Sequence, residues 1–141
     1  MIASTVKYLM VVAAVFALSA KAKPIELKRE EITAASVTGR TLFDQYTLGQ
    51  DVDGARIIYT SQYQQSFDSV QSEITLEYVF PGPDASNDSL ITKITLYVEA
   101  SDDATTQAYV IDGGIGQTSI TLQIVAHNSD YLRYMVIVYG K

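Results

Sequence analysis

The residue types that most often perform catalysis are sparse in this sequence. The chain has one histidine, His127, and no cysteine, so an activated nucleophile would depend on that single imidazole. The run from His127 to Asp130 is typical of a turn between two strands. A zinc site would need three or four convergent His, Cys or carboxylate ligands. We therefore predict no catalytic residue and no zinc site.

Acidic residues occur in pairs, but their spacing does not match a metal-binding loop. The pairs fall in three expected turns: Asp51 with Asp53, Asp84 with Asp88, and Asp102 with Asp103. An EF-hand needs oxygen ligands at alternate positions and a closing glutamate between two helices. None of the three turns has this pattern, and aspartate favours turns for its own local hydrogen bonding. We expect neither a bound metal nor another cofactor.

A glycine-rich segment, Gly113-Gly114-Ile115-Gly116, superficially resembles a phosphate-binding loop. Such loops lie between a strand and a helix, whose N-terminus faces the phosphate. Here the glycines lead into residues 118–122, which have a strand pattern, and no lysine of a P-loop follows. We interpret Gly113, Gly114 and Gly116 as a structural turn that requires positive φ or a close backbone approach.

Charge and composition limit the classes of partner. The chain has 10 Lys and Arg against 16 Asp and Glu, a formal net charge of −6. An acidic protein without clustered basic residues repels phosphate backbones, which argues against direct nucleic-acid binding. Because cysteine is absent, no disulfide can hold the fold together, and stability must come from apolar burial and strand pairing.

From about residue 41 onward, apolar residues alternate with polar ones. This period of two indicates strands with one buried face and one exposed face. The expected strands are 55–63, 73–80, 90–98, 107–111, 120–126, 131–139 and a weaker one at 41–48. The run 131–139 is apolar on both faces except at Arg133, which favours a central strand covered on both sides. We predict an all-β fold, a single antiparallel β-sandwich or small barrel of six to seven strands.

The first 22 residues have the three parts of a secretory signal peptide. Lys7 precedes an apolar stretch of eleven residues, 8–18, and small residues follow up to Ala22. Eleven helical residues reach about 16 Å, which is too short for a hydrocarbon core of roughly 30 Å, so we expect no membrane span. We predict cleavage after Ala22, or alternatively after Ala20. Removal of Lys7 and Lys21 would change the net charge from −6 to −8.

The remaining sequence is divided into an arm and a domain. Residues 23–40 are polar and mixed in charge, and we expect a loose arm or a short helix that begins at Pro24. Residues 41–141 form the β-domain. Asn87 begins the sequon Asn87-Asp88-Ser89 in a proline-containing loop, and it is a candidate glycosylation site that agrees with export. Tyrosines on exposed strand faces, such as Tyr97, would suit a recognition surface.

Several segments in order resemble one known family. They are residues 46–49, 91–94, 113–116, 119–122 and the ending Ile137-Val138-Tyr139-Gly140. Together they resemble the multiprotein bridging factor two family of small insect proteins, from about residue 41 to the C-terminus. The acidic segment 99–104 departs from the more glycine-rich connection that the resemblance implies.

The resemblance implies binding of other proteins without catalysis. The family takes its name from a transcriptional coactivator that bridges a DNA-bound regulator to general transcription factors without binding DNA itself. Many members nevertheless carry signal peptides and appear as secreted products, including components of saliva and venom. We therefore expect a secreted, non-enzymatic β-domain that acts through protein or small-ligand contacts in an extracellular fluid. The alternatives are a nuclear bridging coactivator and, least favoured, an enzyme with an unrecognised site around His127.

Overall fold

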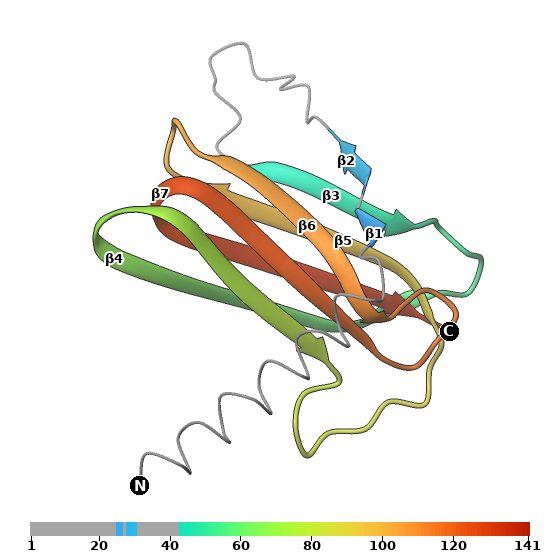
Figure 1. Ribbon diagram of the computed structural model, residues 1–141. Coiled ribbons are helices and arrows are strands. Elements are labelled where there is room, and N and C mark those ends of the chain that lie inside the picture. The colour runs from blue at the N-terminus through green and yellow to red at the C-terminus, as the bar shows by residue number, and fades with distance from the viewer. Residues whose placement is uncertain (1–24, 27, 31–42) are drawn as a thin grey trace, which may run out of the picture.

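The computed structural model describes residues 25, 26, 28–30 and 43–141 (Figure 1). The expected leader, residues 1–22, and most of the polar arm lie outside the described residues. Every element in the described part is a strand, and the expected all-β class is confirmed. None of the described segments forms a helix of the length and hydropathy that a membrane span requires.

Seven strands follow one another along the chain. They are β1 (Ile25–Glu26), β2 (Lys28–Glu30), β3 (Asp44–Gly49), β4 (Arg56–Phe80), β5 (Ile91–Ala100), β6 (Thr105–Gly113) and β7 (Ile120–Gly140). The described residues of the arm are therefore two short strands and not the helix that we considered. They pair with the domain, β1 with β6 and β2 with β3.

All strand pairs are antiparallel, and β7 is the central strand of the sheet. The hydrogen-bonded order is β1-β6-β7-β5-β3-β2, and β4 pairs with β7 outside this path. The first part of β7, up to His127, pairs with β6, and the part from Leu132 pairs with β5. Strand β4 accompanies β7 along both parts. β7 therefore joins two halves of one sheet.

The two longest strands each combine two runs that the sequence pattern had separated. We expected a turn at residues 127–130, but β7 continues through it, and this prediction was wrong. Instead the strand bends, with Asn128 at φ 63°, and residues 67–70 of β4 bulge opposite it. Residues with turn chemistry tolerate the irregular backbone of a bend as well as that of a reversal. Figure 1 shows β4 and β7 both curving back on themselves.

The core lies between the two halves of the curved sheet. A hydrogen bond of 2.7 Å between the hydroxyls of Tyr46 on β3 and Thr106 on β6 joins strands that are not neighbours in the sheet. Fully buried side chains come from alternate positions of the strands, as the period of two predicts. The largest are Tyr46, Ile91, Ile94, Leu96, Ile120, Leu122, Ile124, Leu132, Val98, Val136 and Val138.

The last apolar run has one covered face and one accessible face. Leu132, Val136 and Val138 are fully buried, as expected for a central strand. The other face is not covered: Arg133 is exposed and Met135 is 39% exposed. The expectation that both faces are covered was therefore wrong. An apolar side chain on a pleated strand does not by itself show that a second layer packs on it.

Tyr78 on β4 carries a hydroxyl that is buried without a hydrogen-bond partner. Its ring contacts that of Tyr134 at a centroid distance of 6.1 Å. Burial, and then the neighbouring Tyr59 and Tyr134, raise the pKa of Tyr78, so the folded protein strongly prefers the neutral phenol. Unfolded tyrosine ionises near pH 10. The stabilising contribution of neutral Tyr78 is therefore complete below about pH 10 and is lost as the pH rises above it.

We expect Tyr78→Phe to lower the unfolding free energy at neutral pH by no more than about 1 kcal/mol, or to raise it. The reason is that the substitution removes a buried hydroxyl without a hydrogen-bond partner. Above about pH 10 the variant should lose less stability than the parent. Urea unfolding at neutral and alkaline pH measures both effects. A loss of more than about 2 kcal/mol at neutral pH would show that the hydroxyl is bonded.

Candidate functional site

The accessible face of the sheet gathers a few long polar and aromatic side chains around Arg133. The strand register sets two rows across this face. Gln64 on β4, Arg133 on β7 and Glu99 on β5 form one row. The adjacent row is made of Gln62, Met135, Tyr97 and Gln45. Because alternate residues of a strand point to one side, both rows lie on the face opposite the core.

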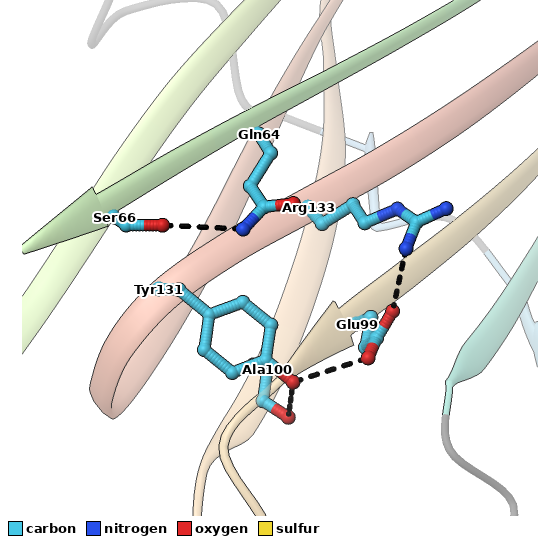
Figure 2. Close-up of polar contacts among 6 residues, drawn as sticks. All are labelled: Gln64, Ser66, Glu99, Ala100, Tyr131 and Arg133. Atoms are coloured by element: carbon cyan, nitrogen blue, oxygen red, sulfur yellow. Dashed lines mark hydrogen bonds and ion pairs between the residues drawn. The ribbon is translucent and has the colours of Figure 1, made fainter.

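The carboxylate of Glu99 contacts both Arg133 and Tyr131 (Figure 2). The guanidinium of Arg133 lies 3.6 Å from one carboxylate oxygen of Glu99, and the Arg133 side chain is 53% exposed. The hydroxyl of Tyr131 lies 3.2 Å from the other oxygen of Glu99 and 3.1 Å from the carbonyl of Ala100, so it can donate to either. Burial, and then the charge and hydrogen bond of Glu99, raise the pKa of Tyr131. The phenol thus stays protonated and helps to hold Glu99 beside Arg133.

An apolar hollow of about 360 Å³ lies on one side of this ion pair. Phe43, Tyr97 and Met135 line it together with Glu99 and Arg133. The rings of Phe43 and Tyr97 meet edge to face at 5.4 Å. Phe43 is 40% and Met135 is 39% exposed. Aromatic and methionine side chains in an accessible hollow are typical of surfaces that receive an apolar group.

A polar hollow of about 340 Å³ lies on the other side of Arg133. Its lining includes Gln64, Ser66, Asp130 and Tyr131. The amide nitrogen of Gln64 donates to the hydroxyl of Ser66 at 3.2 Å. A third hollow, lined by Gln62, Tyr63, Gln64 and Arg133, adjoins it. We call these three hollows, which share Arg133, the Arg133 groove.

The Arg133 groove is chemically suited to binding. Its apolar end can bury a side chain, while the charged and amide groups can orient a polar backbone or a charged group by hydrogen bonds. In the part of the chain that the structure describes, no group of three His, Asp or Glu side chains converges in a way that could hold a metal ion.

Comparison with known proteins identifies the family. The family model described as Transcription activator MBF2 matches residues 48–140, which is more than half of the chain. The chain belongs to the MBF2 family. The expected relationship to multiprotein bridging factor two is thereby confirmed. Neither the curated proteins nor the solved structures contain a match to this chain.

The MBF2 match includes nearly all of the Arg133 groove. Gln62, Gln64, Tyr97, Glu99 and the lining residues of β7 lie within residues 48–140, and Phe43 lies before them. The sequence indicated Tyr97 as a candidate recognition residue, and the structure places it in the groove. Arg133 was noted only as an interruption of an apolar run. A single arginine in such a run was the available signal that this face is accessible.

Asn87 lies in the loop between β4 and β5 of this MBF2-family chain. Its side-chain amide nitrogen donates to the carbonyls of Ser89 and Thr118 at 2.7 and 3.0 Å. Its side-chain oxygen accepts from the backbone N–H of Ser89 at 3.2 Å. Both amide hydrogens are therefore used. Attachment of a glycan to this nitrogen would replace one of them and remove one of these bonds.

The glycine turn and His127, also singled out from the sequence, do not line the groove. Gly113, Gly114 and Gly116 have φ of 68°, 145° and 82° in the connection between β6 and β7. His127 lies on β7 opposite Glu73 on one side and Thr105 on the other. The structure thus does not bring His127 together with the glycine turn or with Asn87.

Proposed function

We propose that this MBF2-family chain acts without catalysis, as a transcription coactivator that binds another protein through the Arg133 groove. The family name describes a transcription activator. In this proposal the chain bridges a DNA-bound regulator to general transcription factors and does not contact DNA itself. The accessible hollow formed by Phe43, Tyr97 and Met135 beside the Arg133–Glu99 pair is the observation that supports the proposal.

The chemistry of the groove and of the whole chain agrees with a protein partner. Arginine, aromatic residues and methionine are enriched at protein interfaces. The net charge of −6 disfavours phosphate backbones. A partner with an apolar anchor for the hollow and hydrogen-bonding groups for Arg133 and Glu99 would use both ends of the groove.

We expect Arg133→Gln to weaken retention of the partner about tenfold, since central arginines often dominate an interface. The fold should be nearly unaffected, because exposed ion pairs contribute about 1 kcal/mol or less. The measurement is a pull-down of purified general transcription factors by the immobilised protein, titrated to give apparent affinities.

Lys141→Gln is the matched control, because it removes the same charge at an exposed site outside the groove. This control should bind as the parent does. If no general transcription factor is retained by the parent, the coactivator proposal fails. If the parent binds but both variants bind equally well, the groove is not the binding surface.

A second candidate function is that of an exported binding protein in an extracellular fluid. The leader-like composition of residues 1–22 and the sequon at Asn87 support it. In this setting the same non-catalytic contacts would serve a partner outside the cell. The two candidate functions differ in where the chain is found and in its first residue, and not in the chemistry of the groove.

Fractionation of expressing eukaryotic cells separates the two settings. Export predicts a product in the medium that begins at Lys23 and loses mass on glycosidase treatment. Ser89→Ala should abolish that loss of mass, and it preserves the loop because the two bonds between Asn87 and Ser89 use the backbone of Ser89 and not its side chain. A full-length product that accumulates in nuclei would contradict export and support the coactivator role.

A further inference from the structure

The first part of β4 is highly exposed to solvent. We call residues 56–68 the β4 edge segment. None of its residues is buried, and Ile57, Tyr59 and Tyr63 are 54%, 49% and 51% exposed. Within the described part of the chain, β4 pairs with β7 and with no other strand. The backbone groups on the other side of β4 are therefore open to a further strand.

Between its irregular ends, the β4 edge segment lacks the residues by which sheet edges usually resist pairing. Such edges carry lysines, prolines or inward-pointing charges. Strand β4 contains no lysine and no proline over its 25 residues. The run 57–67 has eleven uncharged residues and includes two isoleucines and two tyrosines, which favour strands. This edge therefore favours the addition of a strand.

The charges at the two ends of the segment indicate which strand is added. Arg56 and Asp68 flank the uncharged run, each six residues from Gln62. Both side chains are exposed, and among the described residues neither makes an ion pair. Antiparallel pairing of two identical segments about Gln62 brings Arg56 of each copy near Asp68 of the other, just beyond the two ends of the regular run 59–66. Parallel pairing would place like charges side by side.

We propose that the partner at this edge is a second copy of the chain, paired antiparallel through the β4 edge segment about Gln62. The contact is self-complementary, as a two-fold dimer requires. It extends one sheet across both copies and satisfies the open backbone groups. It also covers part of the exposed faces of Tyr59 and Tyr63.

The proposed dimer has a consequence for binding. Gln62 and Gln64 line the Arg133 groove and lie beside the proposed two-fold axis. Since antiparallel sheet extension keeps the same face outward in both copies, the two grooves would lie next to each other on one surface. The dimer would then present two adjoining sites to a partner. The pairing itself does not depend on the proposed function.

The test is the self-association of the full chain measured by analytical ultracentrifugation from about 1 µM to about 1 mM, a range that covers affinities from tight to weak. We expect a monomer–dimer equilibrium for the parent. Arg56→Asp and Asp68→Arg each convert two attractive cross-strand pairs into repulsive ones, so each should raise the dimer Kd about tenfold. The double variant Arg56→Asp/Asp68→Arg restores opposite charges and should restore the parent affinity.

A matched control is Glu73→Arg, which reverses an exposed charge on the same strand outside the segment. It should leave the dimer Kd within about twofold of the parent, and circular dichroism verifies that each variant is folded. A parent that stays monomeric across the concentration range overturns the proposal. That result would also be obtained if a different protein, and not a second copy, pairs with this edge. A dimer that is insensitive to the single reversals, or that the double variant does not restore, also overturns it.

Discussion

Val136→Asp is expected to lower the unfolding free energy by about 4 kcal/mol or more, enough to leave the domain largely unfolded at ordinary temperatures. Val136 is fully buried. It lies on the central strand β7, between Leu96 of β5 and Ser61 of β4. A carboxylate at this position would be buried without a partner, and desolvation of an unpaired charge is costly. Thermal and urea unfolding followed by circular dichroism measure the loss.

Met135→Asp provides the matched control for the strand assignment. Met135 is the preceding residue on the same strand but lies on the accessible face and is 39% exposed. A carboxylate there remains hydrated, so the loss should be about 1 kcal/mol or less. If both variants melt within a few degrees of the parent, Val136 is not in the core. If both are equally destabilised, the face around Arg133 is covered.

Gly113→Ala should lower the unfolding free energy by about 3 kcal/mol, somewhat less than Val136→Asp. Gly113 has φ of 68° at the end of β6. A side chain in this conformation costs about 1–2 kcal/mol by itself. A Cβ atom here would also overlap the backbone carbonyl of Ser119 and lie 2.9 Å from the Cα of Ile120. These backbone atoms lie just before and at the start of β7, so relief requires opening of the β6–β7 connection.

Gly116→Ala separates the backbone conformation from the steric contact. Gly116 also has positive φ, 82°, but a Cβ atom there would meet nothing within 4 Å. Its substitution should cost only the conformational part, about 1–2 kcal/mol. Urea unfolding of the two variants gives the difference. Equal losses would show that the close approach of Gly113 to Ser119 contributes nothing.

The local patterns predicted most of the strands of this protein. The alternation in residues 73–80 and 120–126 gave the correct buried faces, with Ile74, Tyr78, Leu122 and Ile124 in the core. The turn around residues 101–103 is also found, where the N–H of Ala104 bonds the carbonyl of Ser101. Strand faces and turns could be predicted because the alternation of side chains and the residue types of turns are local properties of a short segment.

The sequence predicted less of the candidate site than of the strands. Tyr97 was selected because it falls on a polar face, and that criterion needs only the neighbours along one strand. Arg133, Glu99 and Gln64 become one row only through the pairing of three strands. Phe43 precedes β3 and reaches Tyr97 across a strand pair. Such contacts depend on register, and nothing in the local sequence specifies the register between distant segments.

By itself the sequence determined the all-β class, the alternation of buried and accessible residues and the family of the chain. The tertiary structure alone decided that residues 120–140 form one bent strand, that the face around Arg133 is uncovered and that, among the described residues, β4 has a neighbouring strand on one side only. The reason is physical. Strand period is set by the pleat of each segment, whereas bending, covering and edges are set by contacts between segments far apart in the chain.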